Sequence, residues 1–270
     1  MQKLFIITTV LILAFIFSCS ETNKPKSDLV EQEVVYTSDS TNLKGFLVYD
    51  NNIKEKRPGV IIVHEWWGLN DYARSRARML AELGYTAFAL DMYGDGKTAN
   101  HPEDAQKFAG AIFNNVKMGE DRFLAAYNFL KRQETVEPNN IAAAGYCFGG
   151  AVVLHMARIG TDLKAVASFH GGIQAITPAE EGKVKAFVLV CNGADDQFTT
   201  QEQIDAFKKE MDSAKVQYEF VNYEGAIHSF TSPAADSLGK KFNMPLAYNE
   251  NADKESWLEM QKVFEKAFGK

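Results

Sequence analysis

Residues 140–155 read Asn-Ile-Ala-Ala-Ala-Gly-Tyr-Cys-Phe-Gly-Gly-Ala-Val-Val-Leu-His. The apolar run 141–144 is typical of a buried strand, and the small and apolar residues after Gly149 continue at helical spacing. This order predicts a strand, a very tight turn and a helix, with Cys147 at the tip of the turn. Gly145 and Gly149 lack the Cβ atoms that would collide where the strand and the helix nearly touch.

Residues 145–149 match the Gly-x-Ser-x-Gly nucleophile elbow, with sulfur in place of the serine oxygen. The positive end of the following helix would favour a thiolate at Cys147. Two structural alternatives stay open on these residues alone. A cysteine also packs well as a small buried hydrophobe, and in an exported protein Cys147 and Cys191 are able to form a disulfide.

The composition is that of an ordinary globular protein. The 270 residues suit one large domain or two small ones, and 46% hydrophobic and 24% charged residues are typical values. A net charge of −6 without any basic cluster argues against a nucleic-acid partner. No pair of histidines or cysteines has metal-ligand spacing, so we do not expect a metal site. We also expect no other cofactor. We expect a monomer.

The first residues are expected to be a targeting segment. Lys3 precedes the apolar run 4–17, which is too short to span a bilayer comfortably, and Ser18-Cys19-Ser20 follows at once. This pattern resembles a bacterial lipoprotein signal, which is cut before a cysteine that then carries lipid. Phe17 is bulky where a small residue is usual, so an ordinary secretory peptide or an uncleaved anchor is the alternative.

This pattern divides the chain into three parts. We expect a signal peptide at 1–18, a polar tether at 19–31 and one domain at 32–270. The protein would be exported and lipid-anchored through Cys19 to the bacterial cell envelope, in the periplasm or at the outer surface. Its only contact with the membrane would be that lipid.

Beyond the tether, the pattern predicts an α/β fold. An antiparallel hairpin over 33–49 comes first, and strands then alternate with helical segments, which favours a mostly parallel sheet with helices on both faces. The later strands are expected at 60–63, 85–90, 141–144, 164–169, 185–191 and 216–222. The helices are expected from 70 or 71 to 83, from 102, from 118 to 133, after the elbow, from 201 to 213 and from 251 to 268.

Several predicted strands are followed directly by residues whose side chains could act in catalysis. Open α/β sheets bind their ligands at the carboxyl ends of the strands. The residues in question are His64-Glu65-Trp66-Trp67-Gly68, Cys147, Asn192-Gly193-Ala194-Asp195-Asp196 and Gly225-Ala226-Ile227-His228-Ser229-Phe230. Nucleophile, acid and histidine thus follow the chain order of the α/β-hydrolase triad. Cys147 would attack a carbonyl carbon and His228 would exchange the thiol proton, while an aspartate at 195 or 196 orients the imidazole.

Two further features suit this chemistry. The backbone N–H groups of Phe148 and Trp66 are placed to form an oxyanion hole. Glu65 stands between the apolar Val63 and the Trp66-Trp67 pair, so it would be partly desolvated, with a raised pKa.

Together these motifs resemble the dienelactone hydrolase family of the α/β-hydrolases. The residues that carry the resemblance are Val63-His64-Glu65-Trp66-Trp67-Gly68, Asp91-Met92-Tyr93-Gly94, Gly145-Tyr146-Cys147-Phe148-Gly149-Gly150, Gly193-Ala194-Asp195-Asp196 and His228-Ser229-Phe230. The resemblance implies a carboxylic ester hydrolase similar to carboxymethylenebutenolidase, with a triad of Cys147, His228 and Asp196. It also implies that Glu65 bonds the resting thiol and helps to activate it.

We expect Trp67, Tyr93 and His170 to line the substrate pocket, because each follows a predicted strand at the same edge. His64 and His155 are expected to be structural.

The chain departs from the family at two arginines that hold the substrate carboxylate in dienelactone hydrolases proper. Asp95 and Ser232 stand at those positions here. An aspartate would repel an anionic substrate, so a neutral ester, lactone or thioester is expected instead. The alternative is a surface-tethered ligand-binding protein on a degenerate hydrolase scaffold.

Overall fold

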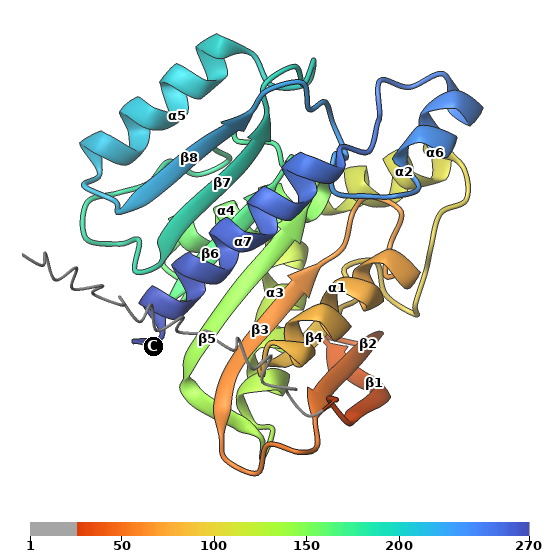
Figure 1. Cartoon of the computed structure of the whole chain (residues 1–270), viewed down its shortest axis with the longest axis vertical. Helices are drawn as coiled ribbons and strands as arrows, with labels where there is room; N and C mark the ends of the chain where they lie inside the picture. Colours follow the sequence, from red (N-terminus) through yellow and green to blue (C-terminus); the bar gives the residue numbers. More distant parts are fainter. Residues whose placement is uncertain (1–25, 270) are drawn as a thin grey trace, which may run out of the picture.

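The computed structural model describes residues 26–269. The predicted signal peptide, Cys19 and most of the predicted tether lie outside the described residues. The described chain forms one sheet of eight strands in the order β1-β2-β4-β3-β5-β6-β7-β8 (Figure 1). The strands are β1 (Leu29–Ser38), β2 (Thr41–Asp50), β3 (Arg57–Val63), β4 (Thr86–Leu90), β5 (Val136–Tyr146), β6 (Ala165–Phe169), β7 (Phe187–Gly193) and β8 (Tyr218–Tyr223). The helices are α1 (Asp71–Glu82), α2 (Pro102–Phe113), α3 (Val116–Lys131), α4 (Phe148–Arg158), α5 (Gln201–Ser213), α6 (Ala235–Phe242) and α7 (Glu250–Ala267).

The antiparallel part of the sheet is the N-terminal hairpin. β1 and β2 pair along their whole length, and Asp39 in the connecting turn has the positive φ, 51°, that tight hairpin turns require. β2 also pairs antiparallel with β4, whereas all pairs from β4 through β3 to β8 are parallel. The predicted fold class is therefore confirmed.

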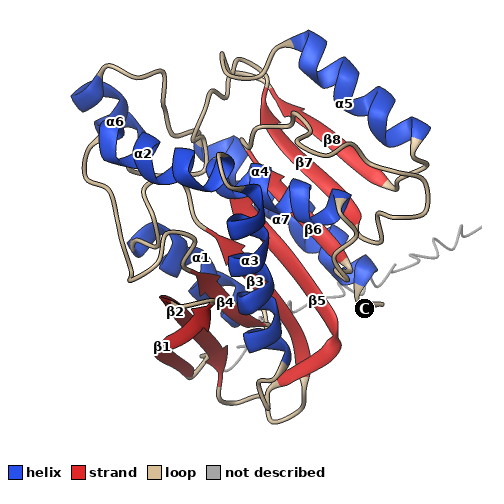
Figure 2. Cartoon of the chain, turned by 180° about the vertical axis from the view of Figure 1, so that it is seen from behind, coloured by secondary structure: helices blue, strands red, loops and turns tan. Residues whose placement is uncertain are grey.

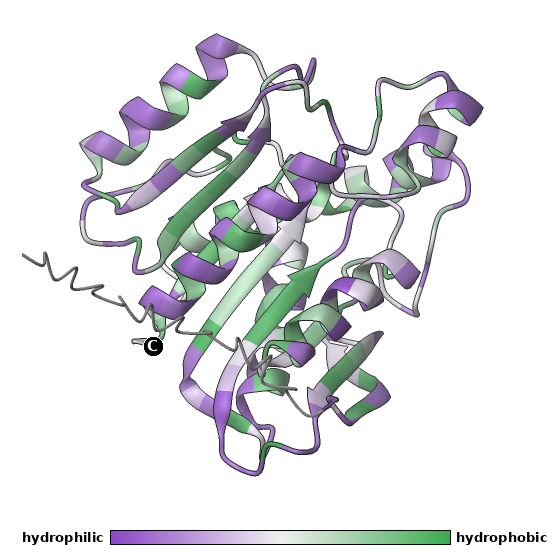
Figure 3. Cartoon of the chain, in the orientation of Figure 1, coloured by the Kyte–Doolittle hydropathy of each residue, from purple (hydrophilic) through white to green (hydrophobic). Residues whose placement is uncertain are grey.

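Helices cover both faces of the sheet because alternate strand residues point to opposite sides. In β7, Val188 and Val190 join the core under α3, α4 and α5, whereas Leu189 and Cys191 join the core under α1 and α7. Figure 1 shows α1 and α7 in front of the sheet, and Figure 2 shows α3 and α4 on the opposite face. In Figure 3 the central strands are mostly green (hydrophobic), whereas α5 and α7 alternate between purple and green residues.

Several elements differ from the sequence-based expectation. β1 begins at Leu29 and pairs with β2 from that residue on, so residues 29–31 belong to the sheet and not to the predicted tether. β3 begins at Arg57, three residues before the predicted run. β5 begins at Val136, before the predicted apolar run, because Val136 pairs with Arg57 at the start of β3. Helix α6 has no counterpart in the prediction, because it is short and carries Gly239 at its centre, a poor helix former. Phe242 of α6 stacks on Trp67 beyond the strand ends, with ring centroids 6.1 Å apart. Within residues 26–269, no helix has the length and apolar character needed to cross a bilayer.

Candidate active site

Cys147 occupies the turn between β5 and α4, where its backbone is strained. Its φ of 53° and ψ of −114° are rare for any residue other than glycine. The Cys147 N–H donates to the Phe169 carbonyl oxygen at 3.0 Å, and the Cys147 carbonyl accepts from Gly150 and Ala151 in the first turn of α4. The positive end of α4 therefore lies at Cys147.

The two glycines of the turn permit a very close approach of backbone to backbone. A Cβ atom at Gly145 would lie 2.0 Å from the Gly149 carbonyl oxygen. A Cβ atom at Gly149 would lie 2.2 Å from the Val63 carbonyl oxygen. The collision predicted from the glycine spacing is thus confirmed.

Side chains from three strand ends meet at the turn. His228, in the loop after β8, places Nε2 at 3.1 Å from the Cys147 sulfur. Its Nδ1 donates to Oδ2 of Asp196 at 2.8 Å, and the Phe198 N–H donates to the other Asp196 oxygen at 2.9 Å. Asp195 is exposed to solvent, so the structure places Asp196 rather than Asp195 against the histidine.

The surroundings of His228 favour its charged form. Burial alone would lower the pKa of this imidazole, but the neighbouring Cys147 sulfur and the hydrogen bond to Asp196 raise it to about 10. The charged imidazole is thus stabilised on both sides, by the sulfur at Nε2 and by the Asp196 carboxylate at Nδ1. This is the arrangement that activates a cysteine nucleophile.

The two alternatives for Cys147 are resolved by its surroundings. Cys147 and Cys191 are both free, so the disulfide is ruled out. Cys191 is fully buried in β7, and the Tyr223 hydroxyl donates to its sulfur at 3.7 Å. Cys147 is partly exposed and borders a pocket, so the role of a small buried hydrophobe belongs to Cys191.

Glu65, directly after β3, is a buried carboxylate that is only 3% exposed. Burial raises its pKa to about 7, although His228, Ser229 and Arg76 act in the opposite direction. The desolvation predicted from its neighbours is therefore present. The expected hydrogen bond between Glu65 and the thiol is absent. Oε1 of Glu65 accepts instead from the Ser229 hydroxyl at 3.1 Å, and the Cys147 sulfur pairs with His228. The backbone of Ser229, with a φ of 61°, turns its hydroxyl towards the carboxylate.

The backbone N–H groups of Trp66 and Phe148 are free. Neither donates a hydrogen bond to another residue within the described chain. Tyr93 supports the first of them, because its hydroxyl donates to the Trp66 carbonyl oxygen at 2.9 Å. Asp91 in turn accepts the N–H groups of Tyr93 and Gly94. The expectation that Tyr93 lines the pocket is wrong, since this buried side chain holds the Trp66 loop from behind.

A pocket of about 430 Å³ opens onto the Cys147 sulfur. It is lined by Trp66, Gln106, Cys147, Phe198, His228, Met244 and Leu246. Most of this lining is aromatic or aliphatic. Phe198 is 54% exposed and lies edge-on against the His228 ring, with centroids 5.0 Å apart. The place of Phe198 two residues after Asp196 is the one signal by which the sequence could have found it, whereas Met244 and Leu246 carry none.

The expected pocket positions of Trp67 and His170 are also wrong. Trp67 packs against Phe242 on the wall of a separate cavity. His170 is 1% exposed and lies behind His228, with ring centroids 5.2 Å apart, while its Nε2 pairs with the Thr231 hydroxyl at 2.8 Å. Both residues follow a strand at the correct edge, but packing turns their side chains away from the pocket.

The remaining buried histidines have structural partners. His64 donates from Nδ1 to the Glu65 carbonyl oxygen and accepts from the Met92 N–H, and burial lowers its pKa to about 4. His155 pairs with Glu120 at 2.9 Å. Within residues 26–269, no group of three or more His, Cys, Asp or Glu side chains is arranged to hold a metal ion.

Comparison with known proteins agrees with this geometry. The sequence profile of the dienelactone hydrolase family matches residues 43–268, which is most of the chain. The chain belongs to the dienelactone hydrolase family. Its similarity to solved members extends over their whole length. The dienelactone hydrolase-like promiscuous phosphotriesterase P91 from metagenomic libraries is 35% identical, with a TM-score of 0.82 over 88% of this chain and 98% of that one.

Two other proteins are similar. The solved structure named m3DLH is 37% identical, with a TM-score of 0.83 over 89% of this chain and 99% of that one. Protein usf of Aquifex pyrophilus is 28% identical over 211 residues, which are 77% of this chain and 90% of that protein.

Two residues of this chain stand where dienelactone hydrolases proper have arginines. Neither residue supplies positive charge to the pocket. Asp95 is exposed and pairs with Lys97 at 3.5 Å. Ser232 is buried, 3% exposed, on the wall of the separate cavity. Within the described chain, the lining of the pocket at Cys147 contains no lysine or arginine.

Proposed function

We propose that this member of the dienelactone hydrolase family cleaves a small uncharged ester, lactone or thioester through an acyl-enzyme on Cys147. The observation that carries the proposal is the position of His228 between the Cys147 sulfur and the Asp196 carboxylate, at 3.1 Å and 2.8 Å. Such a chain of nucleophile, base and orienting acid is what covalent catalysis requires.

In this mechanism the Cys147 thiolate attacks the carbonyl carbon, and the resulting oxyanion accepts the N–H groups of Phe148 and Trp66. The C–O bond to the leaving group, or the C–S bond in a thioester, breaks as His228 gives its proton to the departing oxygen or sulfur. His228 then takes a proton from water, whose oxygen attacks the thioester carbon. The C–S bond to Cys147 then breaks, which releases the acid and restores the Cys147 thiolate. Asp196 keeps the imidazole in one tautomer throughout.

Glu65 enters the proposal as a partner in thiol activation that acts through a neighbour. It contacts Ser229, the residue after His228, and not the sulfur. Because burial brings its pKa to about 7, this carboxyl group is able to hold or release a proton near neutral pH beside the base.

The proposed substrate is uncharged because the pocket lining of the described chain has no lysine or arginine to pair with a carboxylate. The charged imidazole of His228 is already paired with Asp196 and with the Cys147 sulfur. Trp66, Phe198, Met244 and Leu246 present apolar surface, and Gln106 is the one neutral polar side chain among the lining residues of the described chain. An anionic substrate would lose its hydration without gaining a lysine or arginine partner.

The direct test replaces Cys147 with alanine and measures hydrolysis of p-nitrophenyl butyrate, with circular dichroism as the control for folding. We expect a folded protein without activity, and unchanged activity would refute the nucleophile. The intact mass after exposure to the ester separates the alternatives. A working enzyme returns to its original mass, a stalled one retains the acyl group, and a binding protein on a degenerate scaffold gains none.

We also propose that the protein is exported and lipid-anchored through Cys19. The support is the order Lys3, apolar run 4–17 and Ser18-Cys19 in the sequence. Expression of the full chain and of Cys19→Ala in a bacterium, followed by membrane fractionation and the mass of the N-terminal peptide, tests this. An unmodified Cys19 in the wild-type protein would refute it.

A further inference from the structure

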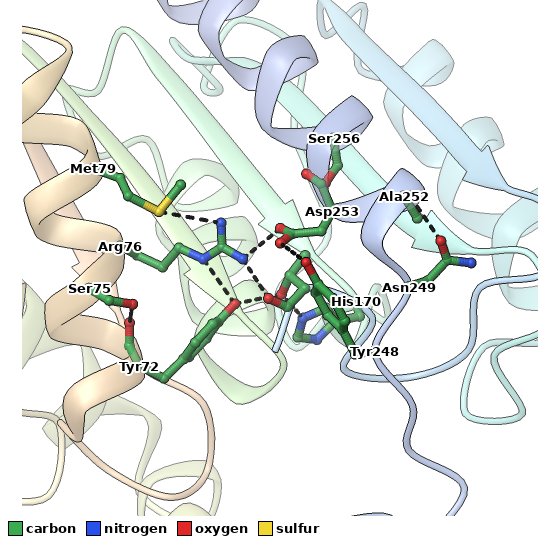
Figure 4. Close-up of polar contacts among 11 residues, drawn as sticks. Tyr72, Ser75, Arg76, Met79, His170, Tyr248, Asn249, Ala252, Asp253 and Ser256 are labelled. Carbon is green, nitrogen blue, oxygen red and sulfur yellow. Dashed lines mark hydrogen bonds and ion pairs between the residues drawn. The ribbon is translucent and has the colours of Figure 1, made fainter. Parts of the chain in front are cut away.

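A buried arginine outside the pocket joins the elements around the candidate site. Arg76 lies on α1 with 4% of its side chain exposed, and its Nη2 donates to the Asp253 carboxylate of α7 at 2.6 Å. The same Nη2 donates to the Thr231 carbonyl oxygen, and Nε donates to the Tyr72 hydroxyl at 3.3 Å. Figure 4 shows the guanidinium between Tyr72 on α1 and Asp253 on α7, with His170 nearby.

Thr231 connects Arg76 to the histidine loop, which we define as residues 228–232. The Thr231 side chain is fully buried, and its hydroxyl lies 2.6 Å from the Tyr72 hydroxyl and 2.8 Å from Nε2 of His170. His170 packs edge-on against the His228 ring. Both the carbonyl and the hydroxyl of Thr231 are thus held, three residues from His228.

The partner of Arg76 holds the pocket wall. The second oxygen of Asp253 accepts from the Tyr248 hydroxyl at 3.2 Å. The segment 244–249, which includes the pocket residues Met244 and Leu246, is bonded to the histidine loop through Ala247 N–H to His228 O and Asn249 N–H to Phe230 O. The ion pair therefore ties the histidine loop and the pocket wall to α1. That helix begins a few residues after Glu65.

We propose that Arg76 is a positioning residue of the hydrolase site, which fixes the histidine loop and the pocket wall relative to the strand end that carries Glu65. This inference rests on the proposed role of His228 as the base. Stability alone is a weak reason for such a pair, because replacing a buried ion pair with apolar residues is often neutral or stabilising.

The chain contains a matched control. Arg158 and Glu210 form a second ion pair, with side chains 3% and 16% exposed, against 4% and 14% for Arg76 and Asp253. Arg158 also donates to a backbone carbonyl, that of Ile173, at 2.8 Å. The control pair joins α4 to α5 and contacts neither the histidine loop nor the pocket wall.

The experiment compares three variants of the full chain with the wild type. The first is the double variant Arg76→Met, Asp253→Leu, which removes both charges. The second is Arg76→Lys, which keeps the positive charge but loses the forked donor geometry. The third is the control double variant Arg158→Met, Glu210→Leu. One readout is kcat for p-nitrophenyl butyrate, divided by the titrated active sites so that unfolded protein is not counted. The other is the pH dependence of Cys147 alkylation by iodoacetamide, followed on the Cys147 peptide.

We expect kcat per site to fall by about 10- to 100-fold in the Arg76→Met, Asp253→Leu protein, because small misplacements of catalytic groups have effects of that size. Alkylation of Cys147 at neutral pH should become slower, because a displaced imidazole no longer takes the thiol proton across the present 3.1 Å. The groups that face His228, namely Cys147, Asp196, His170 and Glu65, are all retained, but the variant also removes the charge of Arg76, which acts on Glu65 and His170. Arg76→Lys keeps that charge, so a change in its alkylation profile reports the position of the imidazole. Arg76→Lys should lose part of kcat, and the Arg158→Met, Glu210→Leu protein less than about threefold.

The proposal is overturned if the Arg76→Met, Asp253→Leu protein keeps both kcat per site and the wild-type alkylation profile. Equal losses in the control pair would overturn it as well, because they would make the effect a general one of core disruption. A wild-type protein that does not hydrolyse the ester refutes the proposed function instead, and the alkylation profiles then decide the role of Arg76 by themselves.

Discussion

Replacing Glu65 with glutamine should change how the stability of this protein depends on pH. The pKa of Glu65 rises from 4.5 to about 7 on folding, chiefly through burial. Between these two values the native state keeps a proton that the unfolded chain releases. The free energy of unfolding therefore falls as the pH rises from about 4.5 through 7, and the loss is complete above that range.

The size of this loss follows from the two pKa values, which differ by about 2.5. At about 1.4 kcal/mol for each pKa unit, it is about 3 kcal/mol. Glutamine still accepts the hydrogen bond from Ser229, but it does not ionise. The stability of Glu65→Gln relative to the wild type should thus increase by about 3 kcal/mol between pH 4.5 and pH 8.

Urea unfolding followed by tryptophan fluorescence at pH 4.5, 6 and 8 measures this difference. Glu103→Gln is the control, because that side chain on α2 is 89% exposed and its loss changes no buried charge. Wild type and Glu65→Gln curves that remain parallel over this pH range would refute the reasoning. An equal change in Glu103→Gln would do so too, because it would assign the effect to net charge.

Two further substitutions test the geometry of the turn and of the acid. Asp196→Asn should lower kcat for a p-nitrophenyl ester by about 100-fold or more, because the imidazole loses its charged partner. Asp195→Asn should have little effect on kcat. If a steady-state assay gives the opposite ranking, Asp195 and not Asp196 is the acid. Gly149→Ala would place a Cβ atom 2.2 Å from the Val63 carbonyl oxygen and should lower the Tm by about 10 °C or prevent folding. Gly110→Ala in α2, where a Cβ atom meets nothing within 4 Å, should leave the Tm unchanged or raise it, and similar Tm values for the two alanine variants would contradict the clash.

Much of the fold was predictable because its signals are local. The apolar run of β3 and the helix start at Asn70 are read from neighbouring residues, and the structure places them where the pattern does. The short helix α6 was not predictable in this way. Its Phe242 is held by Trp67, a residue far away in the sequence, and no local pattern reports such a contact.

Some of the residues that line the pocket were also not predictable from local sequence patterns. Tyr93 and His170 stand at strand ends, where catalytic residues gather, yet both are buried behind the site. Met244 and Leu246 lie in an unremarkable connection between α6 and α7, yet they form the pocket wall. Their place depends on hydrogen bonds from this connection to the loop that carries His228.

The residues themselves were sufficient to locate the elbow at Cys147 and the strand ends that supply Glu65, His228 and one of two aspartates. This follows because glycine spacing and strand ends are properties of consecutive residues. The family resemblance already favoured Asp196 over Asp195, and the tertiary structure places the Asp196 carboxylate against His228. Only the tertiary structure turned Glu65 towards Ser229 instead of the sulfur. Those directions depend on how loops from distant parts of the chain pack against one another, and that packing has no counterpart in the order of the residues.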